Sequence, residues 1–148
     1  VWIYVPLQTL TLWDLHIWWA IDRWRRRHGE DVRHWLDAVG EVEALAALGS
    51  LAYEQPAWVF PTIDAAAETI DGANVGHPLL RDDVRVCNDL RIGPPGRFQL
   101  ITGSNMSGKS TLLRAIGLNV LLAHAGGPVC ASAFRLPLVT LHTSMRIT

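Results

Sequence analysis

The eight residues from Gly103 to Ser110 follow the spacing G-x-x-x-x-G-K-[ST], in which two glycines enclose a short loop before a lysine and a hydroxyl residue. Glycines let the backbone turn so that successive N–H groups face one anion. Lys109 supplies a positive charge for β- and γ-phosphates, and the hydroxyl of Ser110 is an oxygen ligand of the kind that Mg²⁺ prefers. The sequence therefore predicts a site for the phosphates of a nucleotide and Mg²⁺, formed by Gly103, Ser104, Asn105, Met106, Ser107, Gly108, Lys109, Ser110 and Thr111. Thr111 either contacts the α-phosphate or faces solvent, and the sequence favours neither.

The segments on either side of this loop predict the elements that position it. The apolar run 98–101 indicates a strand that enters the loop, and the pattern over residues 109–125 indicates a helix that leaves it. Gly126, Gly127 and Pro128 end this helix. Its first turn presents unpaired N–H groups and the positive end of the helix dipole to the phosphates. The predicted fold class is therefore α/β, of the P-loop nucleoside triphosphatase type.

Upstream of the loop, the sequence predicts a helical segment over residues 1–55, followed from residue 56 by the first part of the nucleotide-binding domain. We expect Gly29, after His28, to end a first helix and Asp31 to cap a second. An apolar stripe on the second helix predicts packing against a neighbour. The stripe contains Val32, Trp35, Leu36, Val39, Val42 and Ala46.

Short strands and turns are expected on both sides of the loop. Residues 62–92 are predicted to contain several strands, with turns at Asp71–Gly72 and Asp82–Asp83. A Gly-Pro-Pro-Gly turn covers residues 93–96. Two further strands are expected at residues 129–133 and 138–142.

Charge is spread unevenly along the chain. Of the 148 residues, 49% are apolar and 18% are charged, a composition that indicates a globular rather than a disordered protein. Residues 1–74 carry 5 basic and 11 acidic side chains, a net charge of −6, whereas residues 75–148 carry 8 and 3, a net charge of +5. The positive half contains the loop, which suits a polyanionic ligand.

The two cysteines and residues 1–21 indicate where in the cell the protein is expected. Cys87 and Cys130 are two isolated cysteines without metal-site spacing, which favours reduced thiols in a cytoplasmic protein. Residues 1–21 have about the length of a membrane helix and precede an Arg-rich segment, but Pro6, Asp14 and His16 interrupt them. A buried helix is therefore the favoured interpretation, and membrane association of the protein is the alternative.

No Asp or Glu follows Asp89 in the sequence. A P-loop ATPase needs an acidic residue for Mg²⁺ and a group that orients the attacking water. We therefore expect this chain to be a part of a larger Mg²⁺-dependent ATPase. A nucleotide binder that does not hydrolyse ATP by itself is the alternative.

Residues 102–111 read T-G-S-N-M-S-G-K-S-T and resemble the loop T-G-P-N-M-x-G-K-S-T of the MutS mismatch-repair ATPases. The Asn105–Met106 pair discriminates, because most other P-loop families place other residues there. Residues 76–80 resemble the family segment G-R-H-P, with Gly76 in place of Arg, and residues 88–90 resemble a segment that enters the ATPase sheet. Residues 123–131 resemble A-x-x-G-x-x-V-P-A, with Cys130 in place of Pro. The resemblance covers residues 70–148, and the Trp-rich start is more similar to a divergent MutS-related branch.

The resemblance implies an ABC-type ATPase that forms a homodimer and binds ATP, ADP and Mg²⁺. Its nucleotide state would control clamping on DNA, with DNA contacts mostly outside this chain. The resemblance places Asn105 near the γ-phosphate and the attacking water, so Asn105 and Lys109 are the candidate catalytic residues. It places Arg85 and Asn88 near the adenine. The family often has an aromatic residue where Arg85 stands, and a planar guanidinium can stack in its place. A solvated strand residue is the alternative for Arg85.

Two other functions compete with a DNA-clamping ATPase. One is a regulatory module on a membrane-proximal helical protein, in which ATP changes the conformation without being hydrolysed. The other is a different P-loop enzyme, such as a small-molecule kinase. The Asn105–Met106 pair argues against the kinase.

Overall fold

The computed structural model describes residues 9, 11–104 and 108–144. Two compact units divide between Leu45 and Ala46. The helix α2 covers Trp13–Glu54. The strands are β1 (Thr62–Ile63), β2 (Ile70–Val75), β3 (Asn88–Ile92) and β4 (Ala133–Leu136), and the helix α3 covers Lys109–His124. The fold is mixed α/β, and the predicted domain boundary after residue 55 stays a prediction.

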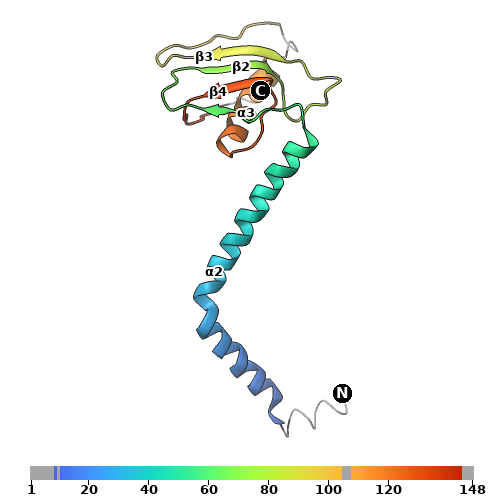
Figure 1. The fold of residues 1–148 in the computed structure, drawn as a ribbon, viewed down its shortest axis with the longest axis vertical. Coiled ribbons are helices and arrows are strands. Elements are labelled where there is room, and N and C mark those ends of the chain that lie inside the picture. The colour runs from blue at the N-terminus through green and yellow to red at the C-terminus, as the bar shows by residue number, and fades with distance from the viewer. Residues whose placement is uncertain (1–8, 10, 105–107, 145–148) are drawn as a thin grey trace. The chain divides into compact units, whose positions relative to one another are not determined.

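The four strands form one mixed sheet in the order β1-β4-β2-β3 (Figure 1). β1 runs parallel to β4, with Thr62 opposite Arg135. β2 is antiparallel to both of its neighbours, β3 and β4. Asp64, just after β1, binds Arg135 on β4 through an ion pair, and this contact together with the N–H of Ala66 holds the pKa of Asp64 below its usual value. The ion pair thus joins the two strands that pair in parallel.

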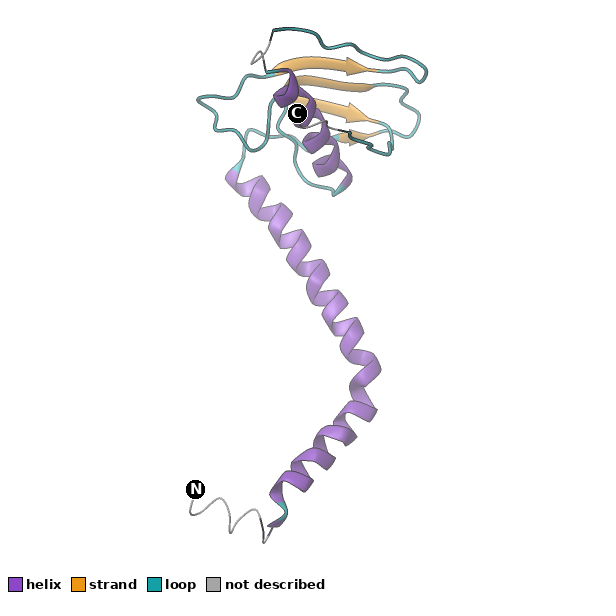
Figure 2. Ribbon diagram, turned by 180° about the vertical axis from the view of Figure 1, so that it is seen from behind, coloured by secondary structure: helices purple, strands orange, loops and turns teal. Residues whose placement is uncertain are grey.

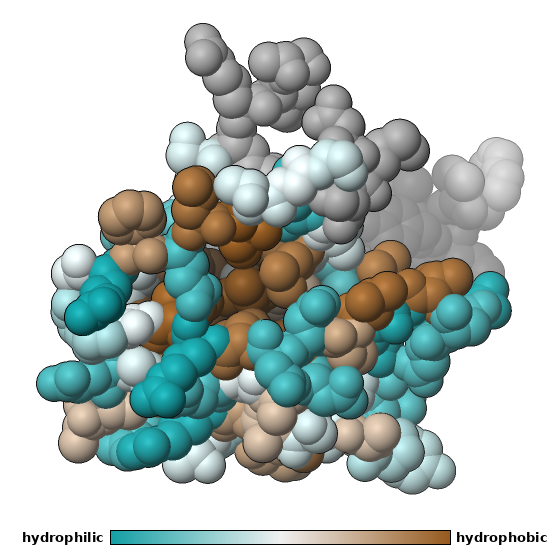
Figure 3. All heavy atoms as spheres, turned by 90° about the horizontal axis from the view of Figure 1, so that it is seen from above, coloured by the Kyte–Doolittle hydropathy of each residue, from teal (hydrophilic) through white to brown (hydrophobic). Residues whose placement is uncertain are grey.

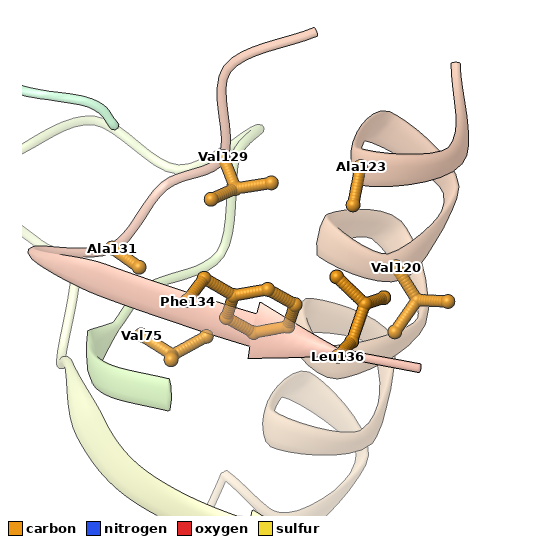
Figure 4. Close-up of a cluster of buried hydrophobic side chains, with 7 residues drawn as sticks. All are labelled: Val75, Val120, Ala123, Val129, Ala131, Phe134 and Leu136. Carbon is orange, nitrogen blue, oxygen red and sulfur yellow. The ribbon is translucent and has the colours of Figure 1, made fainter. Parts of the chain in front are cut away.

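The helix α3 covers one face of this sheet (Figure 2). Its buried residues are Ala115, Asn119, Val120 and Ala123, which lie on one side of the helix because their spacing is i, i+4, i+5 and i+8. Figure 4 shows Val120 and Ala123 facing Phe134 and Leu136 of β4. The core cluster contains Val75, Val120, Ala123, Val129, Ala131, Phe134 and Leu136. Full burial of each large apolar side chain contributes about 1.5–3 kcal/mol, so this face holds α3 on the sheet.

The C-terminal end of α3 confirms the sequence prediction to within one residue. Gly126 has a positive φ of 81°, a conformation that glycine adopts without a steric cost. The N–H groups of Gly126 and Gly127 donate to the carbonyl oxygens of Ala123 and Leu122, at 3.1 and 2.9 Å. Pro128 follows and cannot continue the helix.

The helix α2 corrects the prediction that His28 and Gly29 separate two helices, because it runs through both residues without a break. Glycine costs about 1 kcal/mol relative to alanine within a helix, an amount that neighbouring contacts can offset. The ring of His28 lies 5.7 Å from that of Trp24 and 6.0 Å from that of Trp35, so aromatic contacts continue across Gly29. Asp31 therefore lies inside α2 rather than at a cap.

The apolar stripe of α2 is exposed in this chain instead of packed. Trp35 is 51% exposed, Leu36 66% and Val42 66%. Asp22 binds Arg25 and Arg26 one turn ahead, at 2.9 and 2.7 Å, and the hydrogen bond from Arg26 is the largest cause of its lowered pKa. Within the described residues, no helix has the length and apolar character required to cross a membrane.

The expected turn at Asp71–Gly72 is wrong, because both residues lie within β2. A Cβ atom on Gly72 would stand 2.5 Å from Cγ2 of Val75 and 3.0 Å from the ring of Phe134. The glycine is therefore required by close packing against the core and not by a turn. The turns at residues 82–84 and 94–96 are confirmed.

The strands expected at residues 129–133 and 138–142 are largely wrong. Val129 makes a single bridge with Val59, and the regular strand begins at Ala133. Residues 137–142 have no assigned strand. Apolar runs this short do not show by themselves where their pairing partner will lie.

Candidate functional site

The helix α3 begins at Lys109, directly after Gly108, as the glycine-rich spacing predicts. Gly108 has φ 83° and ψ 6°, the left-handed conformation that glycine permits. The first turn contains no acidic residue, and no side chain caps it. The first turn therefore presents backbone donors and the positive end of the helix dipole without a competing carboxylate. Ser110 and Thr111 lie exposed in the same turn.

Lys109 links the two ends of the loop. Its Nζ donates a hydrogen bond to the carbonyl oxygen of Gly103 at 2.6 Å and another to that of Ser104. The lysine charge is thereby held beside Gly103 and Ser104. The predicted site residues Asn105, Met106 and Ser107 lie outside the described residues, so their predicted roles remain predictions.

The strand expected at residues 98–101 is wrong, since the structure assigns no helix or strand to residues 97–104. Phe98 is 89% exposed and Leu100 is 79% exposed. A strand needs a partner for its backbone N–H and C=O groups, and within the described residues no strand pairs with this run. Figure 3 shows one face of the molecule, on which apolar side chains gather in a hollow surrounded by hydrophilic side chains.

Arg85 is held in place by several neighbours. Its Nε donates to the carbonyl oxygen of Leu80 at 3.1 Å, and its Nη1 lies 2.7 Å from Oδ1 of Asp82. The guanidinium lies over the ring of Trp58, with 5.6 Å between the guanidinium carbon and the ring centroid, and the side chain is only 10% exposed. The structure thus excludes the alternative of a solvated strand residue. Arg85 also lines a hollow of about 560 Å³ together with Gln55, Pro78, Leu79, Leu80, Arg81, Asp82 and Asp83.

Asn88, the other residue expected near the adenine, is the first residue of β3. It is exposed and pairs with Val75 in the β2–β3 ladder. Its neighbour Asp89 accepts a hydrogen bond from the N–H of Asn74 at 2.7 Å. Asn88 is therefore fixed through its backbone at the sheet.

Asn119 is a structural link that the sequence analysis missed. It is fully buried on α3, and its Nδ2 donates to the carbonyl oxygens of Gly76 and Ala115 at 2.9 and 2.8 Å. Its Oδ1 accepts from the N–H of Cys130 at 2.7 Å. These bonds attach Gly76, and with it the Arg85 side chain that packs on Gly76, to the C-terminal half of α3. Lys109, Ser110 and Thr111 lie in the first turn of the same helix. The sequence signal that could have indicated this role is a polar residue among the apolar residues on one face of a helix.

The described residues contain no cluster of three or more His, Cys, Asp or Glu side chains that could hold a metal ion. Ser110 is the predicted Mg²⁺ ligand, and its hydroxyl is exposed at the start of α3. A single hydroxyl fits the way Mg²⁺ binds, because this ion usually keeps several waters and takes its other oxygen ligands from phosphates.

The candidate site is therefore a glycine-containing segment that leads into the helix α3 of a mixed α/β unit. Comparison of the sequence with known proteins identifies the family. Residues 99–147 match the family described as MutS domain V. The DNA mismatch repair protein MutS 1 of Halobacterium salinarum is 41% identical over 103 residues, which cover 69% of this chain and 12% of that protein. DNA mismatch repair protein MutS of Aquifex pyrophilus is 35% identical over 103 residues, 68% of this chain and 12% of the relative. DNA mismatch repair protein MSH6 of Arabidopsis thaliana is 37% identical over 120 residues, 72% of this chain and 9% of the relative.

The chain belongs to the MutS family. It spans about an eighth of the length of the first two of these relatives.

Proposed function

We propose that this chain is the ATP-binding portion of a MutS-like DNA mismatch-repair ATPase. One observation carries the proposal: a helix begins at Lys109 directly after a glycine in the left-handed conformation, in the segment that matches MutS domain V. This is the arrangement that lets backbone N–H groups, a helix dipole and a lysine act together on phosphates.

The triphosphate would bind over the first turn of α3. The Nζ of Lys109 would exchange the carbonyl oxygens of Gly103 and Ser104 for phosphate oxygens. A phosphate anion attracts the lysine cation more strongly than a neutral carbonyl oxygen does, because both partners are then charged, so this exchange is favourable. Ser110 would hold Mg²⁺, and Thr111 would reach the α-phosphate. Mg²⁺ would supply positive charge that neutralises the charge developing on the phosphate oxygens.

The adenine would bind against the segment that contains Arg85 and Asn88. Arg85 is oriented by Leu80, Asp82 and Trp58, so its planar group keeps a fixed direction beside an open hollow. A guanidinium held in this way loses little conformational entropy when a base stacks on it. This arrangement supports the proposed role of Arg85 as an adenine contact.

DNA clamping and dimer closure belong to the proposal as activities of the whole protein. The relatives are DNA mismatch repair proteins by name, and this chain corresponds to about an eighth of two of them. We propose that ATP binding at α3 closes a homodimer, which then clamps DNA. The acidic residue needed for hydrolysis would have to come from outside residues 112–148, because none of these residues is Asp or Glu.

Replacement of Lys109 tests the phosphate site. We expect Lys109→Ala in the intact protein to weaken ATP affinity by at least about tenfold, since a hydrogen bond to a charged group contributes about 1.5–3 kcal/mol. Titration of a fluorescent ATP analogue would measure the affinity.

The matched control is Arg114→Ala, which removes a positive charge from the same helix beyond its first turn. We expect this variant to bind ATP within about twofold of the unmodified protein, because the charge lies outside the loop. Equal affinities for Lys109→Ala and the unmodified protein would reject the phosphate site. Equal losses in the two variants would show a general charge effect instead of a specific contact.

A further inference from the structure

Two cysteines that are 43 residues apart in the sequence meet beside one glycine. The position that a Cβ atom of Gly76 would occupy lies 2.9 Å from Sγ of Cys87 and 2.9 Å from Sγ of Cys130. The two sulfur atoms are therefore no more than twice 2.9 Å apart. The expectation of two isolated cysteines is wrong, because the sheet and α3 bring their side chains to the same place.

Backbone hydrogen bonds fix one member of the pair. The N–H of Cys130 donates to Asn119, and its carbonyl oxygen accepts from the N–H of Gly76 at 2.8 Å. Figure 4 shows the residues next to it, Val129 and Ala131, in the buried cluster. Cys130 is only 3% exposed. Its thiol is therefore held in a defined position inside the protein.

Cys87 is placed differently. It is partly exposed, and it lies in residues 85–87, which belong to no helix or strand. A small movement of this segment toward Cys130 breaks no ladder hydrogen bond. Because Gly76 has no side chain, both sulfurs and the Arg85 side chain can lie close to its backbone.

Exposure also gives the two thiols different reactivity. Burial raises the pKa of the Cys130 thiol, so Cys130 stays protonated at neutral pH. Access to dissolved reagents therefore favours Cys87 as the first thiol to react. Both sulfurs are free in the structure.

We propose that Cys87 and Cys130 form a redox-active thiol pair, which a low-molecular-weight disulfide converts into an intramolecular disulfide across Gly76. In the first step the thiolate of Cys87 attacks one sulfur of the oxidant and releases one thiolate. In the second step Cys130, after losing its proton to water, attacks the Cys87 sulfur and releases the second thiolate. The two cysteines lose two electrons in total, and the oxidant is reduced to two thiols.

The disulfide would join the segment before β3 to the turn before β4. Arg85 lies within this linked region, because its Cδ lies beside the same Cβ position of Gly76. This modification site does not depend on whether the loop 103–111 binds ATP. The two ideas are tested separately.

Incubation of the intact protein with a mixture of oxidised and reduced glutathione tests the pair. Mass spectrometry of a digest made without reduction should show the Cys87 and Cys130 peptides linked to each other. Mass spectrometry of the undigested protein should show a mass about 2 Da lower, because two hydrogen atoms are lost. Both changes should disappear after treatment with dithiothreitol.

Two single substitutions separate the steps. Cys130→Ser should stop at a lasting glutathione adduct on Cys87, whereas Cys87→Ser should give neither adduct nor link, because Cys130 is buried. Circular dichroism would confirm that both variants fold. A lasting adduct on Cys87 in the unmodified protein, or links between two copies only, would overturn the proposal.

Discussion

At the scale of single residues, Asn119 has the largest structural consequence for the candidate site. Its amide joins three backbone groups from different parts of the chain: Gly76, Ala115 and Cys130. A fully buried amide stabilises the fold when all of its hydrogen bonds are formed. Removal of the amide leaves buried backbone groups without partners. Asn119 therefore connects the position of α3 to that of Gly76.

We expect Asn119→Ala to lower the free energy of unfolding by about 3 kcal/mol, because the buried carbonyl of Gly76 and the buried N–H of Cys130 would lose the bonds that the amide makes to them. Urea denaturation followed by fluorescence would measure the change. The matched control is Ser132→Ala, whose exposed hydroxyl donates to the carbonyl oxygen of Ala73 at 3.1 Å. It should cost less than about 1 kcal/mol, and equal losses in the two variants would contradict the structural role of Asn119.

At the scale of elements, α2 contains three glycines that no packing contact requires. A Cβ atom on Gly40 or Gly49 would meet nothing within 4 Å, and one on Gly29 would meet only Cγ of Arg25 at 3.9 Å. Gly72 and Gly127 of the sheet unit differ, since a Cβ atom on them would have neighbours at 2.5 and 2.9 Å. Glycine therefore weakens α2 but is needed for packing near the core.

We expect Gly40→Ala to stabilise α2 by about 0.5–1 kcal/mol, because alanine loses less backbone entropy than glycine when a helix forms. Thermal unfolding followed by circular dichroism at the helix band would show a higher midpoint. Gly72→Ala is the comparison, and its clash with Val75 and Phe134 should lower the midpoint. A lower midpoint for Gly40→Ala would show that the space beside it is filled in solution.

At the scale of the whole molecule, burial is concentrated in one of the two compact units. The core cluster lies entirely within residues 46–148, whereas α2 contains no buried residue. Local opening of a segment costs little free energy when few apolar contacts are lost. The two units should therefore differ in local stability.

We expect hydrogen exchange to be slowest at the amides of Val120, Ala123 and Leu136 and at least about tenfold faster in residues 13–45, since only the former require the core to open. Hydrogen–deuterium exchange with mass spectrometry at one fixed pH would measure the exchange rates of both regions. Equal protection in the two regions would show that α2 is buried by an association in solution.

Local chemistry explains which sequence predictions were confirmed. The start of α3 at Lys109, its end just before Gly126 and the turns at residues 82–84 and 94–96 depend on glycine and proline conformations in a few adjacent residues. The strand at residues 98–101 and the helix break at Gly29 were wrong. Each depended on contacts that a short apolar run or a single glycine does not specify.

The candidate site, too, was predicted from the sequence only in part. The glycine-rich spacing predicted where α3 begins, and the structure confirms that this helix starts at Lys109, directly after Gly108. Nothing in the sequence indicated that Asn119 bonds both Gly76 and Cys130, or that Cys87 lies beside Cys130. These contacts join residues that are between 11 and 43 positions apart, so they depend on how the chain returns to itself.

The sequence alone determined the residue types of the loop, the helix that follows it and the MutS resemblance, because these depend on short-range spacing and backbone conformational preference. Only the tertiary structure decided the strand order β1-β4-β2-β3, the buried position of Asn119 and the meeting of the two thiols. The physical reason is that strand pairing and burial are set by contacts between distant segments, and many different pairings are compatible with the same local pattern.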